Sequence, residues 1–404
     1  MAKILVKDGT IINENRIFHG SLLIEGEKIS AVYENDIPEG LIESCGIIDA
    51  KGLHIFPGII DTHVHFREPG LTHKADIYSE SKAAVAGGVT SFMDMPNTLP
   101  PITTLELLEQ KYKLASKKSL ANYSFYLGAT NNNLHEILAV NPAEVCGIKV
   151  FLGSSTGNML TDDEKILAAL FEQSPALLVI HAEDEGIIRQ NTEFFRKLFG
   201  DNIPVEYHPK IRNDEACFKS SSFAVILAGK YGSRIHLAHL STKSELELLD
   251  KDVLLADKKI TSEVCVNHLV FDDTDYHCLG AKIKCNPAIK TVQDKNALLA
   301  GLISGSIDSV ATDHAPHTIE EKKLDYFKCP SGIPMVQHGF VSMLELYHEG
   351  KITLEKITDK LCHAPAVIYR IAGRGFIRRG YKADIVMVDL NKSWKVENTN
   401  ILSK

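Results

Sequence analysis

The stretch Phe56-Pro57-Gly58-Ile59-Ile60-Asp61-Thr62-His63-Val64-His65-Phe66-Arg67-Glu68-Pro69-Gly70 decides the fold. It begins as an apolar, β-branched run and ends in two histidines separated by one residue. Side chains two positions apart on a strand point the same way, so His63 and His65 can aim at one point beyond the strand's end. Two converging imidazoles suggest a metal ion. Two ordinary surface histidines are the alternative, so further ligands have to come from the rest of the chain.

The composition is that of an ordinary soluble globular protein. The chain has 404 residues, of which 44% are hydrophobic and 24% charged, enough for a large barrel and a small second domain. The net charge of −8 gives no indication that the protein binds nucleic acid. The apolar runs are too short to cross a membrane, and the N-terminus lacks the apolar core of a signal peptide, which favours the cytoplasm. The eight cysteines form no Cys-x-x-Cys pair, so neither a structural zinc site nor a disulfide framework is predicted.

The middle of the chain alternates between strand-like and helix-like segments. Strands are predicted at 55–61, 88–94, 122–127, 147–151, 176–181, 234–240, 259–266 and 307–312. Helices are predicted between most of them, at 79–87, 105–114, 162–171, 220–230 and 295–303. Eight parallel βα units predict a closed (β/α)8 TIM-type barrel. An open doubly wound sheet is the structural alternative, but no Gly-rich phosphate loop follows any of these strands.

Both ends of the chain differ from the middle. Residues 1–53 contain short strands broken by Asp8-Gly9 and Glu25-Gly26, and a turn and a strand follow at 380–389. We therefore expect a small β-sandwich domain built from residues 1–53 plus 366–404, and a hydrolase barrel from 54–365.

Polar residues gather where the predicted barrel strands end, which is where such barrels place their active sites. The set comprises His63, His65, Asp94, Asn97, Lys149, His181, Glu183, His236, His239, Asp313, His314 and His317. Polar groups in such places cost free energy unless they are paired or bind a metal. The sequence therefore predicts a metal centre at the mouth of the barrel.

Two long segments carry a family resemblance. Residues 61–69, Asp-Thr-His-Val-His-Phe-Arg-Glu-Pro, and 311–322, Ala-Thr-Asp-His-Ala-Pro-His-Thr-Ile-Glu-Glu-Lys, resemble the two signatures of the amidohydrolase superfamily, and within it of the dihydroorotases. The resemblance continues through residues 95–98, 147–151, 236–241 and 284–287, so it covers most of the chain.

The resemblance implies a binuclear metal centre with two Zn²⁺ ions per subunit. By this resemblance His63, His65 and Asp313 bind one ion, and His181 and His239 bind the other; zinc suits such ligands. Lys149 would bridge the two ions as an N-carboxylated lysine, because a bare ammonium would be repelled by them. The alternative for Lys149 is a strand-end lysine that reaches solvent.

His236 competes with His239 for the ligand role on the sixth strand. The two are three positions apart, so in a regular strand they point to opposite sides. The resemblance favours His239, and we expect His236 to be packed in the interior or to support a ligand.

The implied reaction is the reversible hydrolysis of (S)-dihydroorotate to N-carbamoyl-L-aspartate, with Asp313 as general base and then acid. Arg67 can meet the substrate carboxylate with a bidentate fork, and Asn97 and His317 are its partners in the family. Asn286 is expected to help hold the pyrimidine ring. Individually these residues have plain alternatives, such as a surface cation for Arg67 or a turn residue for Asn97.

Some positions depart from the family pattern. Asn267 stands where a second histidine beside His268 is common, which leaves the roles of both open. The polar segment 153–158 is either a loop that closes on substrate or a simple turn. The alternatives for the whole chain are a hydantoinase or allantoinase, or a non-catalytic scaffold for aspartate transcarbamoylase. The partners expected are a small-molecule substrate, a second copy in a homodimer and, as a further option, aspartate transcarbamoylase.

Overall fold

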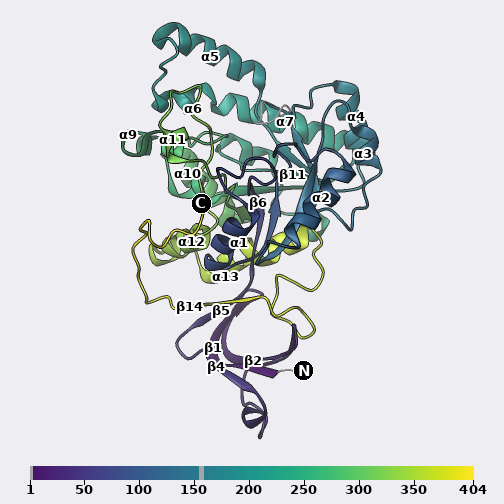
Figure 1. The fold of residues 1–404 in the computed structure, drawn as a ribbon, viewed down its shortest axis with the longest axis vertical. Coiled ribbons are helices and arrows are strands. Elements are labelled where there is room, and N and C mark those ends of the chain that lie inside the picture. Colours follow the sequence, from purple (N-terminus) through teal and green to yellow (C-terminus); the bar gives the residue numbers. More distant parts are fainter. Residues whose placement is uncertain (1–2, 154–158) are drawn as a thin grey trace.

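The computed structural model describes residues 3–153 and 159–404 and contains two separate sheets (Figure 1). One is an eight-stranded parallel sheet from the middle of the chain, and the other is a six-stranded sheet built from both ends. Most of the segment 153–158 that was predicted as a loop, residues 154–158, lies outside the described residues.

The eight-stranded sheet is the predicted barrel. Its strands follow one another in chain order: β6 (Ile59–Val64), β7 (Val89–Asp94), β8 (Asn122–Gly128), β9 (Gly147–Phe151), β10 (Leu178–His181), β11 (Ile235–Leu237), β12 (Ile260–Cys265) and β13 (Ser309–Ala311). The backbone N–H of His65 donates to the His314 carbonyl at 2.7 Å, which brings the first and last strands together beyond their ends. All eight predicted strands are confirmed, and with them the (β/α)8 architecture.

The first barrel strand begins later than predicted. Residues His54–Pro57 form β5, which pairs with β1 and β14 in the small sheet, and only Ile59 onward enters the barrel. Gly58 marks the corner between the two sheets. A Cβ atom there would lie 2.1 Å from the Thr90 hydroxyl, so the chain passes too close to β7 for any larger residue.

Helices cover the outside of the barrel (Figure 1). The five predicted helices are present as α1 (Ile77–Ala86), α2 (Leu105–Ala115), α4 (Glu164–Gln173), α7 (Asp214–Tyr231) and α10 (Val292–Ser304). Each begins after a polar N-cap whose side chain accepts a backbone N–H, in chain order Asp76, Thr104, Asp163, Asn213 and Thr291. The others are α3 (Leu134–Leu138), α5 (Glu185–Phe199), α6 (His208–Ile211), α8 (Val266–Val270), α9 (Tyr276–Leu279), α11 (Ile319–Lys322), α12 (Gly339–His348), α13 (Leu354–Thr358) and α14 (Ala364–Ile368).

The six-stranded sheet has its own apolar core. Its strands are β1 (Lys3–Asn13), β2 (Arg16–Glu25), β3 (Lys28–Tyr33), β4 (Gly46–Asp49), β5 and β14 (Ile385–Val388). Buried side chains that include Val6, Ile11, Leu22, Ile29 and Ile377 pack together on it. A small sheet domain built from both termini is therefore confirmed.

The boundaries of the two domains stay a proposal. Strand pairing places β5 in the small sheet, whereas the residues after β14 return to the barrel, where Leu402 packs against its core. We therefore propose that the small domain extends to Pro57, and that the last residues of the chain belong with the barrel. No helix within 3–153 or 159–404 is long and apolar enough to cross a membrane, and the cytoplasmic location stays a prediction.

Candidate active site and metal centre

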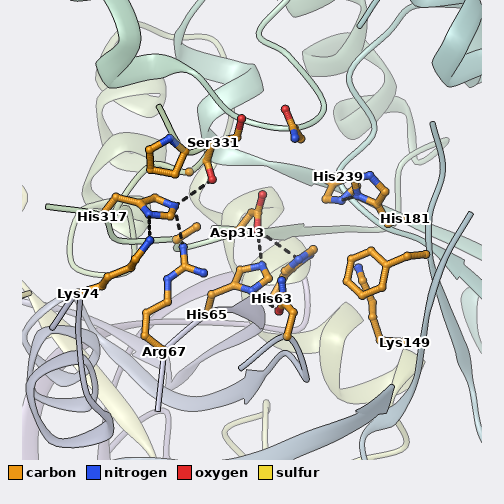
Figure 2. Close-up of a pocket in the computed structure, with 16 residues that line it drawn as sticks. His63, His65, Arg67, Lys74, Lys149, His181, His239, Asp313, His317 and Ser331 are labelled. Carbon is orange, nitrogen blue, oxygen red and sulfur yellow. Dashed lines mark hydrogen bonds and ion pairs between the residues drawn. The ribbon is translucent and has the colours of Figure 1, made fainter. Parts of the chain in front are cut away.

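A cavity of about 270 Å³ opens at the carboxyl ends of the barrel strands (Figure 2). Its lining contains the ten residues predicted for the site: His63, His65, Arg67, Asn97, Lys149, His181, His239, Asn286, Asp313 and His317. These residues come from strand ends and from the loops that follow them, across most of the chain's length. The fold thus brings the predicted set together, while the roles of its members remain predictions.

His63, His65 and Asp313 form a close group on one side of the cavity. Asp313 Oδ1 lies 3.2 Å from His63 Nε2 and 2.9 Å from His65 Nε2. Burial by itself would raise the pKa of Asp313, but His63, His65 and Lys149 outweigh it and hold that pKa at about 2. Burial lowers the pKa of His65 to about 4. An ionised carboxylate beside a neutral imidazole is a donor set that a divalent cation can use.

The opposite ring nitrogens of these histidines are held from behind. His63 Nδ1 donates to Glu263 Oε1 at 2.6 Å, and His65 Nδ1 donates to Asn97 Oδ1 at 2.8 Å. This leaves Nε2 of each ring without a proton and directed at the cavity. Glu263 and Asn97 therefore fix which nitrogen is available to a metal ion.

Lys149 is fully buried on β9 and faces the same cavity (Figure 2). Its Nζ makes no hydrogen bond to any described residue and lies 5.3 Å from the centre of the Phe151 ring. Burial lowers the pKa of Lys149 to about 8. A buried amine without a partner is costly, and a neutral amine is the form that reacts with CO2. The solvent-reaching lysine considered above is therefore wrong, because the side chain is enclosed.

His181 and His239 lie side by side in the cavity, with ring centres 4.7 Å apart, and the His239 ring centre is 5.2 Å from that of His63. His181 Nδ1 lies 2.8 Å from His239 Nε2, and His239 Nδ1 has no partner within the described ranges. Burial, followed by the charges of His181 and Lys149, holds the pKa of His239 well below its ordinary value. Two neutral imidazoles beside a carboxylated lysine would suit a second divalent cation.

Three of the predicted site residues have backbone conformations that are rare outside glycine. The φ angles of Arg67, His239 and Asp313 are +66°, +38° and +47°. Such conformations cost about 1–3 kcal/mol each and concentrate at functional sites. They turn side chains into the cavity just beyond the regular strands.

The positive φ corrects the geometric argument about the sixth strand. β11 ends at Leu237, so His239 does not follow the strand alternation, and it faces the cavity. His236, still in the strand, is fully buried, with Nδ1 2.9 Å from Thr261 Oγ1 and Nε2 3.2 Å from Glu263 Oε2. His236 is thus a packed interior histidine that contacts Glu263 and does not line the cavity.

A buried ion pair lies behind His181. Glu183 Oε2 is 3.2 Å from His181 Nε2 and 2.5 Å from Arg212 Nη1. Burial alone would raise the pKa of Glu183, but Arg212 and His181 outweigh it and hold that pKa at about 2. Glu183 was noted at its strand end, but Arg212 gave no sequence signal, because it lies in a loop after α6.

We expect Arg212→Met to lower the free energy of unfolding by about 3–5 kcal/mol, because it leaves Glu183 buried and charged without its partner. Urea unfolding followed by circular dichroism measures this loss. Arg196→Met is the matched control, since its partner Asp201 is exposed and the pair contributes little. Equal losses for both variants would show that the buried pair is no more important than a surface one.

A cationic corner, formed by Arg67, Lys74 and His317, lies across the cavity from His181 and His239 (Figure 2). Arg67 Nη2 and Lys74 Nζ each lie 3.0 Å from a ring nitrogen of His317. Burial, with the charges of Arg67 and Lys74, lowers the pKa of His317 to about 2, and burial lowers the pKa of Arg67 to about 10. Lys74 Nζ is already paired with Glu321 Oε1 at 3.0 Å, so the Arg67 guanidinium is the group at this corner that favours an anion.

Lys74 was not predicted from the sequence. It follows the first signature in a loop, where a lysine is ordinarily a surface cation, and only the fold places it beside His317. Ser331 also lines the cavity, and its carbonyl accepts from His317 Nε2 at 3.0 Å.

The remaining predicted positions differ in whether they reach the cavity. Asn286 lines it, and its buried Oδ1 has no partner in the described parts of the chain. His268 is buried with Nε2 donating to the Pro287 carbonyl at 3.1 Å, outside the cavity lining. Asn267 is buried with its amide 3.5 Å from the Thr312 carbonyl. Neither of these two reaches the cavity.

Comparison with known proteins places the chain in a family. The model of the amidohydrolase family matches residues 54–403. The chain belongs to the amidohydrolase family. This amidohydrolase is 34% identical over 400 residues to a dihydroorotase from Methanosarcina acetivorans, across 96% of this chain and 84% of that protein. It is also 34% identical to a dihydroorotase from Aquifex aeolicus, across 100% of this chain and 93% of that protein. Within its family the chain therefore groups with dihydroorotases.

Solved structures agree on the fold of this amidohydrolase. An L-hydantoinase from Arthrobacter aurescens superposes with a TM-score of 0.91 at 24% identity, across 100% of this chain and 90% of that one. A dihydropyrimidinase from Brevibacillus agri superposes with a TM-score of 0.84 at 25% identity, across 96% of this chain and 86% of that one. These likenesses support the barrel and its added sheet domain.

Proposed function

We propose that this chain is a zinc-dependent dihydroorotase, which catalyses the reversible hydrolysis of (S)-dihydroorotate to N-carbamoyl-L-aspartate in de novo pyrimidine synthesis. The observation that carries the proposal is one cavity with two ends. One end holds the imidazoles, Asp313 and Lys149, and the other is the cationic corner. The first end suits hydrolysis of an amide, and the second suits a substrate that carries a carboxylate beside that amide.

The ligand set fits two divalent cations. We propose His63, His65 and Asp313 for one ion, His181 and His239 for the other, and N-carboxylated Lys149 as the bridge. The unpartnered buried nitrogens of Lys149 and His239 support this, because partners would otherwise be expected. When bound, such ions supply a hydroxide at neutral pH and polarise the scissile carbonyl.

We propose that Asp313 moves the proton. Its low pKa keeps it ionised at neutral pH, so it can accept a proton from the attacking water. It then donates that proton to the leaving ring nitrogen, and the reverse order serves ring closure. Asp313 Oδ1 lies 3.2 Å from His63 Nε2 and 2.9 Å from His65 Nε2, so the carboxylate stands beside the nitrogens proposed as ligands.

The cationic corner orients the ring. Arg67 can pair with the substrate carboxylate through its guanidinium, with His317 and Asn97 beside it. The Arg67 Nε–H already donates to the Pro316 carbonyl at 3.1 Å, which fixes the plane of the guanidinium. Asn286 is placed to hydrogen-bond the ring amide through its free Oδ1. Hydantoin lacks the carboxylate, so it leaves this corner unused.

Ring opening of dihydroorotate, hydantoin and allantoin by the zinc-loaded protein tests the proposal. We expect turnover of dihydroorotate and little of the other two rings, and loss of activity on removal of zinc by a chelator. Turnover of hydantoin or allantoin alone would make the chain a different cyclic amidohydrolase. A zinc-loaded protein that opens none of the three would favour the scaffold alternative.

We expect Arg67→Lys to lower kcat/KM for dihydroorotate by about 10–200-fold, because a lysine cannot form the bidentate pair with the carboxylate. Most of the change should appear in KM, since the groups around the scissile amide are untouched. Steady-state kinetics in both directions measure it. A matched control is the residual hydantoin activity, which should stay the same in the variant. A parallel loss on both substrates would mean that Arg67 supports the fold of the site instead.

We further propose a homodimer, with association with aspartate transcarbamoylase as an additional option. Apolar side chains exposed on α5 and α7, such as Phe194, Leu198 and Ile226, support an interface there. Sedimentation of the protein alone, and of its mixture with the transcarbamoylase, measures both.

A further inference from the structure

Glu80 is a fully buried carboxylate in the first turn of α1, and the proposed reaction does not use it. Its oxygens accept hydrogen bonds from Ser79 Oγ at 2.8 Å, His314 Nε2 at 2.7 Å, Ser403 Oγ at 2.6 Å and the Lys404 backbone N–H at 3.0 Å. The two final donors come from the far end of the sequence. A buried carboxylate needs such partners, so the contacts of Glu80 join three distant segments.

The His314 contact leads directly to the proposed catalytic group. His314 Nδ1 accepts from the Val336 backbone N–H at 3.1 Å, so Nε2 carries the proton that is donated to Glu80. Both ring nitrogens are used, and His314 does not line the cavity. Its main chain does belong to the site, because it follows Asp313 and its carbonyl accepts the backbone N–H of His65 at 2.7 Å.

The backbone of Asp313 needs this support. Its φ of +47° is unfavourable for an aspartate and persists only where the neighbours are held on both sides. On one side Thr312 Oγ1 donates to Asp61 Oδ2 at 2.5 Å. On the other side His314 is held by Glu80. The position of the Asp313 carboxylate therefore depends on a residue that never reaches the cavity.

Residues 400–404, the C-terminal strap, cover Glu80. Figure 1 shows the chain leaving β14 and returning to end beside α1 and α12. The side chain of Gln337 holds the strap at two points. Its amide donates to the Asn400 carbonyl, and its Oε1 accepts the Leu402 backbone N–H, each at 2.8 Å. Lys404 Nζ donates to the Thr72 carbonyl at 2.8 Å.

We propose that Glu80 is a positioning residue for Asp313, and that the C-terminal strap completes this role through the Ser403 hydroxyl. The strap holds Glu80, and Glu80 holds the His314 side chain. The main chain of His314 follows Asp313 and accepts the backbone N–H of His65. This inference rests on the proposed roles of Asp313 and His65. Docking of the strap then sets both kcat and metal affinity without touching the substrate.

We expect Glu80→Gln to lower kcat for dihydroorotate by about tenfold, with a smaller loss in the same direction for Ser403→Ala. KM should change little, because the cationic corner is not involved. Zinc affinity, measured by competition with a chelator, should fall in parallel with kcat. Ser403→Thr keeps the hydroxyl and should restore both values.

Lys395→Ala is the matched control, because it removes an exposed side chain just before the strap, with Nζ 3.6 Å from Glu397 Oε1, and leaves the contacts of Glu80 and of residues 400–404 in place. It should leave kcat and zinc affinity unchanged. If Glu80→Gln lowers only the melting temperature, with unchanged kcat and zinc affinity in the folded protein, the role of Glu80 is purely structural and the inference is wrong. Zinc affinity tests the strap even if the wild-type protein does not act on dihydroorotate, so the two proposals can fail separately.

Discussion

Asp313→Asn is expected to lower kcat for dihydroorotate by about 10²–10⁴-fold in both directions, because an amide cannot accept the proton of the attacking water or return it to the ring nitrogen. The variant should also bind zinc more weakly, since a neutral oxygen replaces the carboxylate that lies against His63 and His65. Steady-state kinetics, together with metal analysis after dialysis, separate the two effects. At saturating zinc the loss of kcat should remain.

Asp308→Asn provides the matched control for this experiment. Asp308 is also a buried aspartate and precedes the same strand, β13, but it pairs with Lys258 at 2.7 Å and does not line the cavity. Its replacement should cost stability and leave kcat near the wild-type value. Unchanged turnover in Asp313→Asn at full zinc occupancy would refute the assigned role.

Lys149→Met is expected to remove one zinc ion per chain and to lower kcat by more than about 100-fold. A loss of that size is what removing a residue that only supports a metal ligand costs. Without the bridging carboxylate, His181 and His239 alone are a poor site for a divalent ion. Metal analysis counts the ions. Native mass spectrometry should show one added CO2 on the wild-type protein and none on the variant.

The same substitution should stabilise the metal-free protein. Lys149 is buried without a partner among the described residues, so replacing its amine by an apolar side chain of similar length removes a desolvation cost. Lys360→Met is the control: Lys360 is also buried, but its Nζ donates to the Ile307 carbonyl at 2.9 Å, so its loss should destabilise the protein. A wild-type zinc content in Lys149→Met would exclude the bridging role.

Much of the site was readable from the sequence because function at a barrel mouth leaves a local signal. An apolar run that ends in His63 and His65 predicts a strand whose end carries two side chains aimed at one point, and His181 and Asp313 also stand at predicted strand ends. The barrel itself follows from eight strand-like segments with helix-like segments between most of them. These features depend on neighbours in the chain, and so the sequence records them.

Other site residues were visible only in the fold. Arg212 and Lys74 lie in loops, and nothing in their neighbourhood distinguishes them from surface cations until the fold places Glu183 and His317 beside them. His239 faces the cavity as the resemblance predicted, but the strand-alternation argument given beside it does not apply. Strand alternation assumes a regular backbone, and β11 ends two residues before that histidine.

The sequence by itself determined the barrel, the identity of the proposed ligands and the arginine that favours a substrate with a carboxylate. The strand period predicts the barrel, whereas the resemblance of residues 61–69 and 311–322 to dihydroorotases implies the ligands and the role of the arginine. Only the tertiary structure decided which groups stand behind the ligands. Glu263 behind His63, and Glu80 joined to the C-terminal strap, are contacts between segments about 200 and 320 residues apart. Such contacts depend on how the chain closes in space, so no local pattern carries them.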